Sequence, residues 1–245
     1  LLKPFVDFYY LDVLSGIKNI IGPGFGNQKK WLTTENILKD TDFNLSYSEQ
    51  SQKLLKLHNI NLENPIPNLE IDIEKTKNQN LDLLIEGKKI AFGVDSFEDY
   101  KMWYEENFIE LANLLYEKNL FDYIYLICGP EKSYIAKKII SLSNKNYFID
   151  CSNKDLLGII TAIKKSNFFI GNNSGPLNLA SALNVRTFGL IANDAISELK
   201  YSNINCIVPD NYKDNTWIRD RSNMKTLTTE KVFKTIIERL KNESL

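Results

Sequence analysis

Short apolar segments alternate with longer amphipathic ones from residue 89 onward, and this alternation constrains the fold more than any other feature of the sequence. The short segments are predicted strands, at residues 89–94, 123–128, 147–150, 167–171, 187–191 and 205–208. The longer segments are predicted helices, at residues 103–118, 131–143, 154–165, 176–183 and 229–241. Strands that alternate with helices build right-handed βαβ units. The sequence therefore predicts an α/β fold around a parallel sheet that is covered on both faces.

The region before residue 89 lacks this alternation. Residues 46–58 have the spacing of an amphipathic helix, and Ser46 followed by Glu49 resembles a capping box. We expect an N-terminal α/β domain over 1–70, a linker over 71–88, a parallel-sheet domain over 89–225 and a C-terminal helix over 226–245. Residue 1 is Leu rather than Met, so we also expect the N-terminal domain to be truncated.

Composition excludes several classes of protein. The formal net charge is -1, so the chain has no basic surplus to attract nucleic acid. The 3 cysteines are far apart and include no Cys-x-x-Cys pair, which argues against a disulfide scaffold or a zinc site. The sequence has neither an apolar run long enough to cross a bilayer nor a signal peptide. These features favour a soluble protein of a reducing compartment.

The turn after the fourth predicted strand is the strongest candidate for a binding site. Residues 171–176 read Gly-Asn-Asn-Ser-Gly-Pro and lead directly into a predicted helix. Free amides and the helix dipole favour an anion at such a turn, and ligands of open parallel sheets bind beyond the carboxyl ends of the strands. Ser174 can donate a hydroxyl hydrogen bond, and Gly175 leaves room for an anion near the backbone. The competing interpretation is a helix cap and a turn without a ligand.

Two charged residues follow other strands at the same predicted edge of the sheet. Lys101 comes after the first strand and could neutralise a diphosphate, although an exposed lysine is more often simply solvated. Glu131 comes after the second strand and could bind a ribose hydroxyl, although an acid in the first turn of a helix more often caps it.

Residues 168–187, FFIGNNSGPLNLASALNVRT, resemble the signature of glycosyltransferase family 9, the heptosyltransferases. That signature is an apolar strand, a Gly, an Asp-Ser/Thr-Gly turn, a His a few residues later, an Ala-rich helix and another strand. Lys101-x-Trp103 before a helix with Glu110-Leu111-Ala112, and Gly129-Pro130-Glu131 after the second strand, agree in order and spacing. The resemblance covers roughly residues 80–195.

The resemblance implies a GT-B fold, in which a nucleoside-diphosphate sugar binds between two Rossmann-like domains, without a metal or a cofactor. It implies transfer of a sugar such as heptose to lipopolysaccharide or a related surface glycan, by a bacterial cytoplasmic enzyme at the inner membrane. Residues 1–70 are then the remainder of the acceptor domain, and 89–225 the donor domain. The family's general base is expected upstream of residue 1. The expected donor-binding residues are Lys101, Glu131, Asn173, Ser174, Gly175 and Asn178.

Two positions depart from the family pattern. Asn173 stands where the family commonly has Asp, and Asn178 where it commonly has His. Both residues keep hydrogen-bonding capacity and remove a charge or a titratable group. These departures leave two alternatives open: a degenerate binding module without catalysis, and another GT-B enzyme such as a nucleotide-sugar epimerase.

Two motifs near the N-terminus imitate other sites. Residues 22–27 resemble a dinucleotide-binding loop, but Asn27 stands where the third glycine belongs. Residues 40–42 have the Asp-x-Asp form of metal-dependent sugar transferases, yet their polar surroundings favour an ordinary turn.

Other residues could contact an acceptor. Trp31, Trp103 and Trp217 could stack on a sugar, although buried or interface aromatics are the more frequent case. The charge run at residues 219–221 could bind acceptor phosphates, but solvated charges are the default interpretation.

Overall fold

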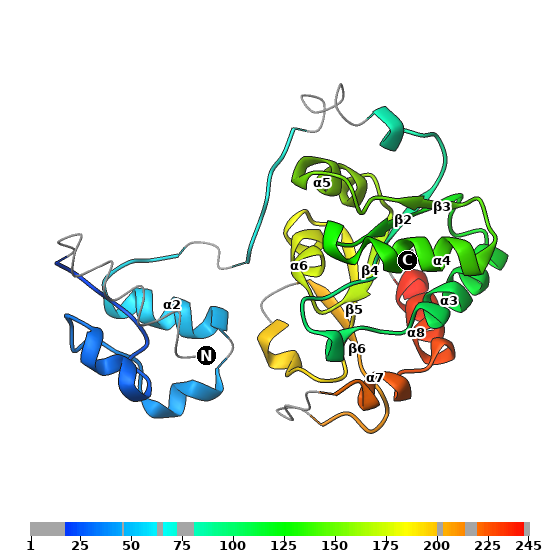
Figure 1. The fold of residues 1–245 in the computed structure, drawn as a ribbon. Helices are drawn as coiled ribbons and strands as arrows, with labels where there is room; N and C mark the ends of the chain where they lie inside the picture. Colours follow the sequence, from blue (N-terminus) through cyan, green and yellow to red (C-terminus); the bar gives the residue numbers. More distant parts are fainter. Residues whose placement is uncertain are drawn as a thin grey trace. The chain divides into compact units, whose positions relative to one another are not determined.

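The computed structural model describes residues 18–45, 47–62, 66–72, 81–199, 203–213 and 220–242. The chain divides into two compact units, Leu1–Ile66 and Pro67–Leu245 (Figure 1). Residues 73–80 of the predicted linker lie outside the described residues. The assignment of acceptor and donor domains to the predicted boundaries stays a prediction.

Within its described residues, the smaller unit contains the 3-10 helices η1 (Gly26–Trp31) and η2 (Asp40–Asn44), followed by α2 (Tyr47–Leu57). Helix α2 confirms the predicted amphipathic helix, while Ser46 of the predicted capping box lies outside the described residues. Asp42 accepts a hydrogen bond from the Lys39 amide at 3.0 Å and pairs with Lys53 at 2.7 Å. The Asp-x-Asp motif therefore contributes to local structure, as expected of a turn.

The larger unit is built on a six-stranded, fully parallel sheet in the order β3-β2-β1-β4-β5-β6. The strands are β1 (Lys89–Gly93), β2 (Tyr123–Ile127), β3 (Phe148–Asp150), β4 (Phe168–Asn172), β5 (Arg186–Leu190) and β6 (Ile204–Ile207). All six predicted strands are present within one or two residues of their predicted ends. The α/β fold class is confirmed.

Helices cover both faces of this sheet (Figure 1). One face packs against α3 (Glu105–Glu117), α4 (Ser133–Ser143) and α8 (Thr229–Asn242), and the other against α5 (Leu156–Lys164) and α6 (Gly175–Ala182). Side chains alternate between the faces along each strand, so that Phe92 joins the first cluster and Ala91 the second. The remaining short helices are η4 (Leu81–Leu83), η5 (Asp99–Lys101), η6 (Pro130–Lys132), η7 (Ile196–Leu199) and α7 (Ser222–Thr226).

The strand order reverses between β1 and β4. From β1 the chain winds outward to β2 and β3, and then returns to the other side of β1 as β4. Ligands of such sheets bind at this reversal, beyond the carboxyl ends of the strands. Gly93 and Gly171 pair there, and a Cβ atom on Gly171 would lie 2.9 Å from Gly93 Cα. A side chain at position 171 would therefore collide with the backbone of β1, and a Cβ atom on Gly93 would lie 2.5 Å from the Phe169 ring.

Within the described residues, no helix combines the length and the apolar character that crossing a membrane would require.

Candidate functional site

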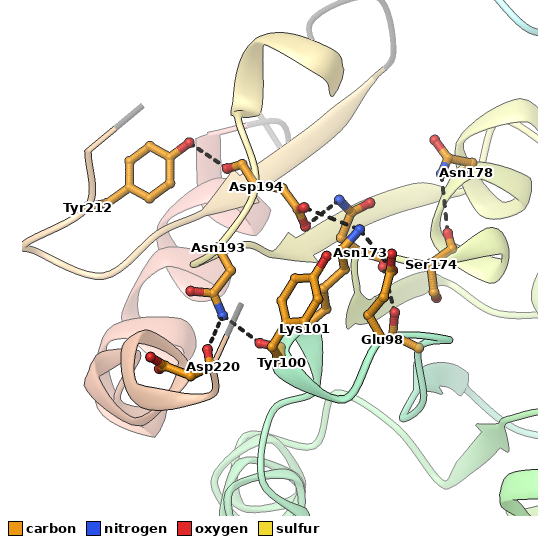
Figure 2. A network of polar contacts seen from close by, with 11 residues as sticks. Glu98, Tyr100, Lys101, Asn173, Ser174, Asn178, Asn193, Asp194, Tyr212 and Asp220 are labelled. Carbon is orange, nitrogen blue, oxygen red and sulfur yellow. Dashed lines mark hydrogen bonds and ion pairs between the residues drawn. The ribbon is translucent and has the colours of Figure 1, made fainter. Parts of the chain in front are cut away.

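Three loops converge at the carboxyl edge of the sheet beside this reversal (Figure 2). They follow β1, β4 and β5 and contribute Lys101, Asn173 and Asp194. Lys101 Nζ lies 3.2 Å from Asp194 Oδ1, and Asn173 Nδ2 donates to Asp194 Oδ2 at 2.8 Å. The Ser96 hydroxyl donates to the Asn173 carbonyl at 3.1 Å, which ties the first loop to the second. One buried carboxylate thus joins two residues that the sequence predicted as donor-binding.

Lys101 is the cation of this network. Its side chain is 17% exposed and lies 3.1 Å from Glu98 Oε2 in addition to Asp194. Burial by itself lowers the pKa of Lys101, but the charge of Asp194 and hydrogen bonds to Glu98 and Asp194 outweigh that effect and raise the pKa. Lys101 therefore carries a positive charge at neutral pH, as a diphosphate partner must.

The N-terminus of α6 follows Asn173, which shares the Asp194 carboxylate with this lysine. Ser174 is the N-cap residue, but its side chain does not cap the helix, and its buried hydroxyl oxygen has no hydrogen-bond partner among the described residues. The first α-helical bond runs from the Asn178 amide to the Ser174 carbonyl at 3.4 Å, so the Gly175 and Leu177 amides precede the first helical bond, while Pro176 has no N–H. A Cβ atom on Gly175 would meet nothing within 4 Å, which leaves the backbone accessible. An orphaned hydroxyl and open amides form a natural anion site.

Asn178 lies one turn into α6, where its Nδ2 donates to the Ser174 carbonyl at 3.2 Å. This contact supports the N-cap residue from within the helix. The structure therefore brings together five of the six predicted donor-binding residues. They are Lys101, Asn173, Ser174, Gly175 and Asn178.

Glu131, the sixth, stands apart from this network. It is exposed in η6, after β2, and no hydrogen bond or ion pair given for the described residues joins it to the network. Its neighbour Lys132 donates to the Ser96 carbonyl at 2.8 Å and to Asp99 at 2.6 Å. The loop that carries Glu131 is therefore fixed to the loop after β1, while the predicted contact of Glu131 with a ribose stays a prediction.

Sequence reasoning missed Asp194 and Asn193, which follow β5. The Asp194 side chain is 3% exposed, and its carbonyl accepts the Tyr212 hydroxyl at 2.8 Å. Asn193 Nδ2 donates to the carbonyls of Tyr100 and Asp220 and so fastens the β5 loop to two neighbouring segments. The same strand-end rule that identified Lys101 applies to β5, and would have identified both residues.

A family model now decides the identity of this chain. The model described as glycosyltransferase family 9 (heptosyltransferase) matches residues 25–236. The chain belongs to glycosyltransferase family 9. No curated protein sequence matches it.

Solved structures agree with this family 9 assignment at the level of the fold. E. coli ADP-heptose LPS heptosyltransferase II is 14% identical with a TM-score of 0.74, and the match covers 97% of this chain and 74% of that one. A family 9 glycosyltransferase from Veillonella parvula is 15% identical, with a TM-score of 0.63 and coverage of 80% and 60%. E. coli heptosyltransferase WaaC with ADP is 20% identical, with a TM-score of 0.56 and coverage of 78% and 55%. The chain thus resembles GT-B heptosyltransferases, and spans little more than half of the last two.

Asp194 places a charge beside the turn that resembles the family signature. The signature has an aspartate where this chain has Asn173, and here a carboxylate from the β5 loop accepts a hydrogen bond from Asn173 at 2.8 Å. Asn173 itself is uncharged, so Asp194 supplies the negative charge at this place.

The structure tests two of the residues that could contact an acceptor, Trp103 and Arg221, with different results. Trp103 is 1% exposed and packs in the core, as expected of a buried aromatic residue. Arg221 was expected to be a solvated charge, and this expectation is wrong. Its guanidinium donates to the carbonyls of Met102 and Trp103 at 3.0 and 3.1 Å and lies over the Tyr104 ring. Trp217 and Arg219 lie outside the described residues, and Trp31 is partly buried in the smaller unit.

Asp95, two residues after β1, titrates with a shifted pKa and so allows a test by pH. Burial raises the pKa of Asp95, although a hydrogen bond from the Gly129 amide and the charge of Lys132 oppose the shift. A raised carboxyl pKa favours folding below the ordinary aspartate range, and this contribution is lost as the pH rises through the folded-state value. Asp95→Asn keeps an acceptor for Gly129 and removes the buried charge.

We therefore expect Asp95→Asn to raise the melting temperature at pH 7 by no more than about 2–4 °C, the effect of 1 kcal/mol in a chain of this size. The gain should shrink as the pH falls and vanish below the ordinary aspartate pKa. Thermal unfolding by circular dichroism from pH 3 to 8 measures it. If the gain in melting temperature is constant across this pH range, it does not come from the ionisation of Asp95.

Proposed function

We propose that this chain binds a nucleoside-diphosphate sugar at the N-terminus of α6, and that the complete enzyme transfers the sugar to a lipopolysaccharide or surface-glycan acceptor. The observation that carries the proposal is that Lys101 and Asn173 share the Asp194 carboxylate, and that Asn173 directly precedes Ser174, whose buried hydroxyl has no hydrogen-bond partner among the described residues. Glycosyl transfer leaves negative charge on the departing diphosphate. Positive groups fixed before the reaction stabilise that charge as it develops.

The donor is proposed to be an ADP-sugar, with heptose as the first sugar to test. The fold relatives support this choice, because two E. coli neighbours are described as an ADP-heptose LPS heptosyltransferase and a heptosyltransferase with ADP. Lys101 and the amides of α6 would supply the charge that a metal ion supplies in other transferases, so metal independence belongs to the proposal. The proposal also includes that the enzyme acts in the bacterial cytoplasm, at the inner membrane. Family membership does not favour the non-catalytic module or the epimerase.

The first experiment is a thermal-shift titration of the chain against ADP, GDP, UDP, CMP and NAD. A ligand whose free concentration is one hundred times its dissociation constant stabilises the folded protein by about 2.7 kcal/mol. In a chain of this size we therefore expect ADP to raise the melting temperature by roughly 5–10 °C.

Lys101→Ala removes a charge-assisted hydrogen bond, worth about 1.5–3 kcal/mol, and should weaken ADP binding by about 10- to 150-fold. Lys137→Ala is the matched control, because Lys137 is an exposed lysine of α4 away from the network. Isothermal titration calorimetry gives the affinities directly. Stabilisation by NAD alone, or equal weakening by both substitutions, would contradict the proposal.

A further inference from the structure

The two carboxylates that contact Lys101 differ in how firmly they are held. The Asp194 side chain is 3% exposed and also accepts from Asn173 at 2.8 Å, so it is fixed on two sides. The Glu98 side chain is 41% exposed, and its ion pair with Lys101 spans only three residues of one short segment. The buried contact is therefore part of the structure, while the exposed one is easily broken.

The backbone around Glu98 does not have to move if its side chain leaves. The Glu98 carbonyl accepts the Lys101 amide at 3.0 Å, and the preceding Ser96 is held by its hydroxyl bond to the Asn173 carbonyl and by Lys132. Rotation about the side-chain bonds of Glu98 is enough to turn its carboxylate into solvent. The loop that carries Lys101 would keep its position.

We propose that Glu98 is a replaceable counter-ion of Lys101, which a diphosphate displaces while Asp194 keeps the lysine in place. This inference rests on the proposed donor site. A diphosphate at α6 would place like charges beside Glu98, so the carboxylate turns to solvent as Lys101 moves from it to a phosphate oxygen. No covalent bond changes.

Such an exchange makes Glu98 a residue that modulates anion affinity. A ligand must break the ion pair between Lys101 and Glu98 to reach the lysine, and this cost is the same for every anion that displaces Glu98. The repulsion between Glu98 and the bound ligand grows with the charge of the ligand. Glu98 therefore lowers the affinity for a diphosphate at least as much as the affinity for a phosphate monoester.

Calorimetric titration with ADP and with AMP tests this inference. Glu98→Gln should tighten ADP binding by about two- to fivefold, the range for a half-exposed ion pair, and should tighten AMP binding by the same factor or a smaller one. High salt should reduce the effect. The matched control is Asp99→Asn, which removes the neighbouring carboxylate at the start of η5, where Asp99 pairs with Lys132 rather than with Lys101. We expect the control to change ADP binding by less than about twofold.

Combining Glu98→Gln with Lys101→Ala shows whether the effect depends on the lysine. The expected result is that Glu98→Gln no longer changes ADP affinity when Lys101 is absent. Unchanged or weaker ADP binding by Glu98→Gln alone would overturn the inference, and so would equal tightening by Asp99→Asn. Neither result would contradict the proposed function, provided that the unsubstituted chain binds ADP and that Lys101→Ala weakens ADP binding. If the unsubstituted chain binds neither ADP nor pyrophosphate, both proposals fall.

Discussion

Replacing Trp103 with alanine is expected to lower the free energy of unfolding by about 3–5 kcal/mol, the usual cost of deleting a large buried aromatic side chain. The ring is 1% exposed and packs edge-on against Phe108, with 5.1 Å between ring centroids. Its Nε1 donates to the Leu227 carbonyl at 2.8 Å, directly before α8. The substitution therefore creates a cavity and leaves a buried carbonyl without its donor.

Urea denaturation followed by circular dichroism measures this loss. Trp103→Phe is the matched variant, because it keeps an aromatic ring and removes only the hydrogen bond and part of the volume. We expect its cost to fall well below that of alanine. If Trp103→Ala costs less than about 1 kcal/mol, as surface substitutions do, the ring is not part of the core and the acceptor-stacking interpretation returns.

Replacing Asp194 with alanine should cost about 2–4 kcal/mol. Removing one partner of a buried ion pair typically costs 3–5 kcal/mol, and the estimate here is lower because Lys101 is 17% exposed and keeps Glu98. Asn173 also loses its acceptor. We expect ADP binding to weaken as well, opposite in sign to the effect of Glu98→Gln, because Lys101 and Asn173 lose the group that positions them.

Asp210→Ala is the matched control for this experiment. Asp210 also pairs with a lysine, Lys231, but its side chain is 94% exposed. An exposed pair contributes at most about 1 kcal/mol, so the control should leave both stability and ADP affinity nearly unchanged. Urea denaturation and calorimetry compare the two variants. If both variants lost stability and ADP affinity equally, Asp194 would contribute only through the net charge of the protein.

The sequence was sufficient to predict the sheet because its strands are short, continuous apolar segments. Such segments are typical of strands buried on both faces of a parallel sheet. The sequence was less reliable at the ends of helices, because tertiary contacts decide at which residue a helix begins. The predicted helix at 103–118 begins at Glu105 instead, because the Trp103 amide donates to the Asn172 side chain at 2.9 Å rather than entering the helix. The residues 131–132 belong to η6, and α4 starts only at Ser133.

The candidate site was predictable in part for the same reason. Lys101 and residues 173–175 follow strands, and the strand-end rule finds them. Asp194 follows a strand too, but an acid in a loop looks like an ordinary turn residue until the fold shows its partners. Arg221 was misjudged because sequence alone does not show which charged side chain reaches buried carbonyls, here those of Met102 and Trp103.

The bond between Asn173 and Asp194 also limits which mutational steps are open to this chain. Placing the aspartate of the resembled signature at position 173 would set two carboxylates about 2.8 Å apart, the length of the present bond. Like charges at that distance cannot both stay ionised without cost. Consensus substitutions often stabilise a protein, but this one would be harmful unless position 194 changed with it. We therefore expect the two positions to be epistatic, because the contribution of either residue to stability depends on which residue the other position carries.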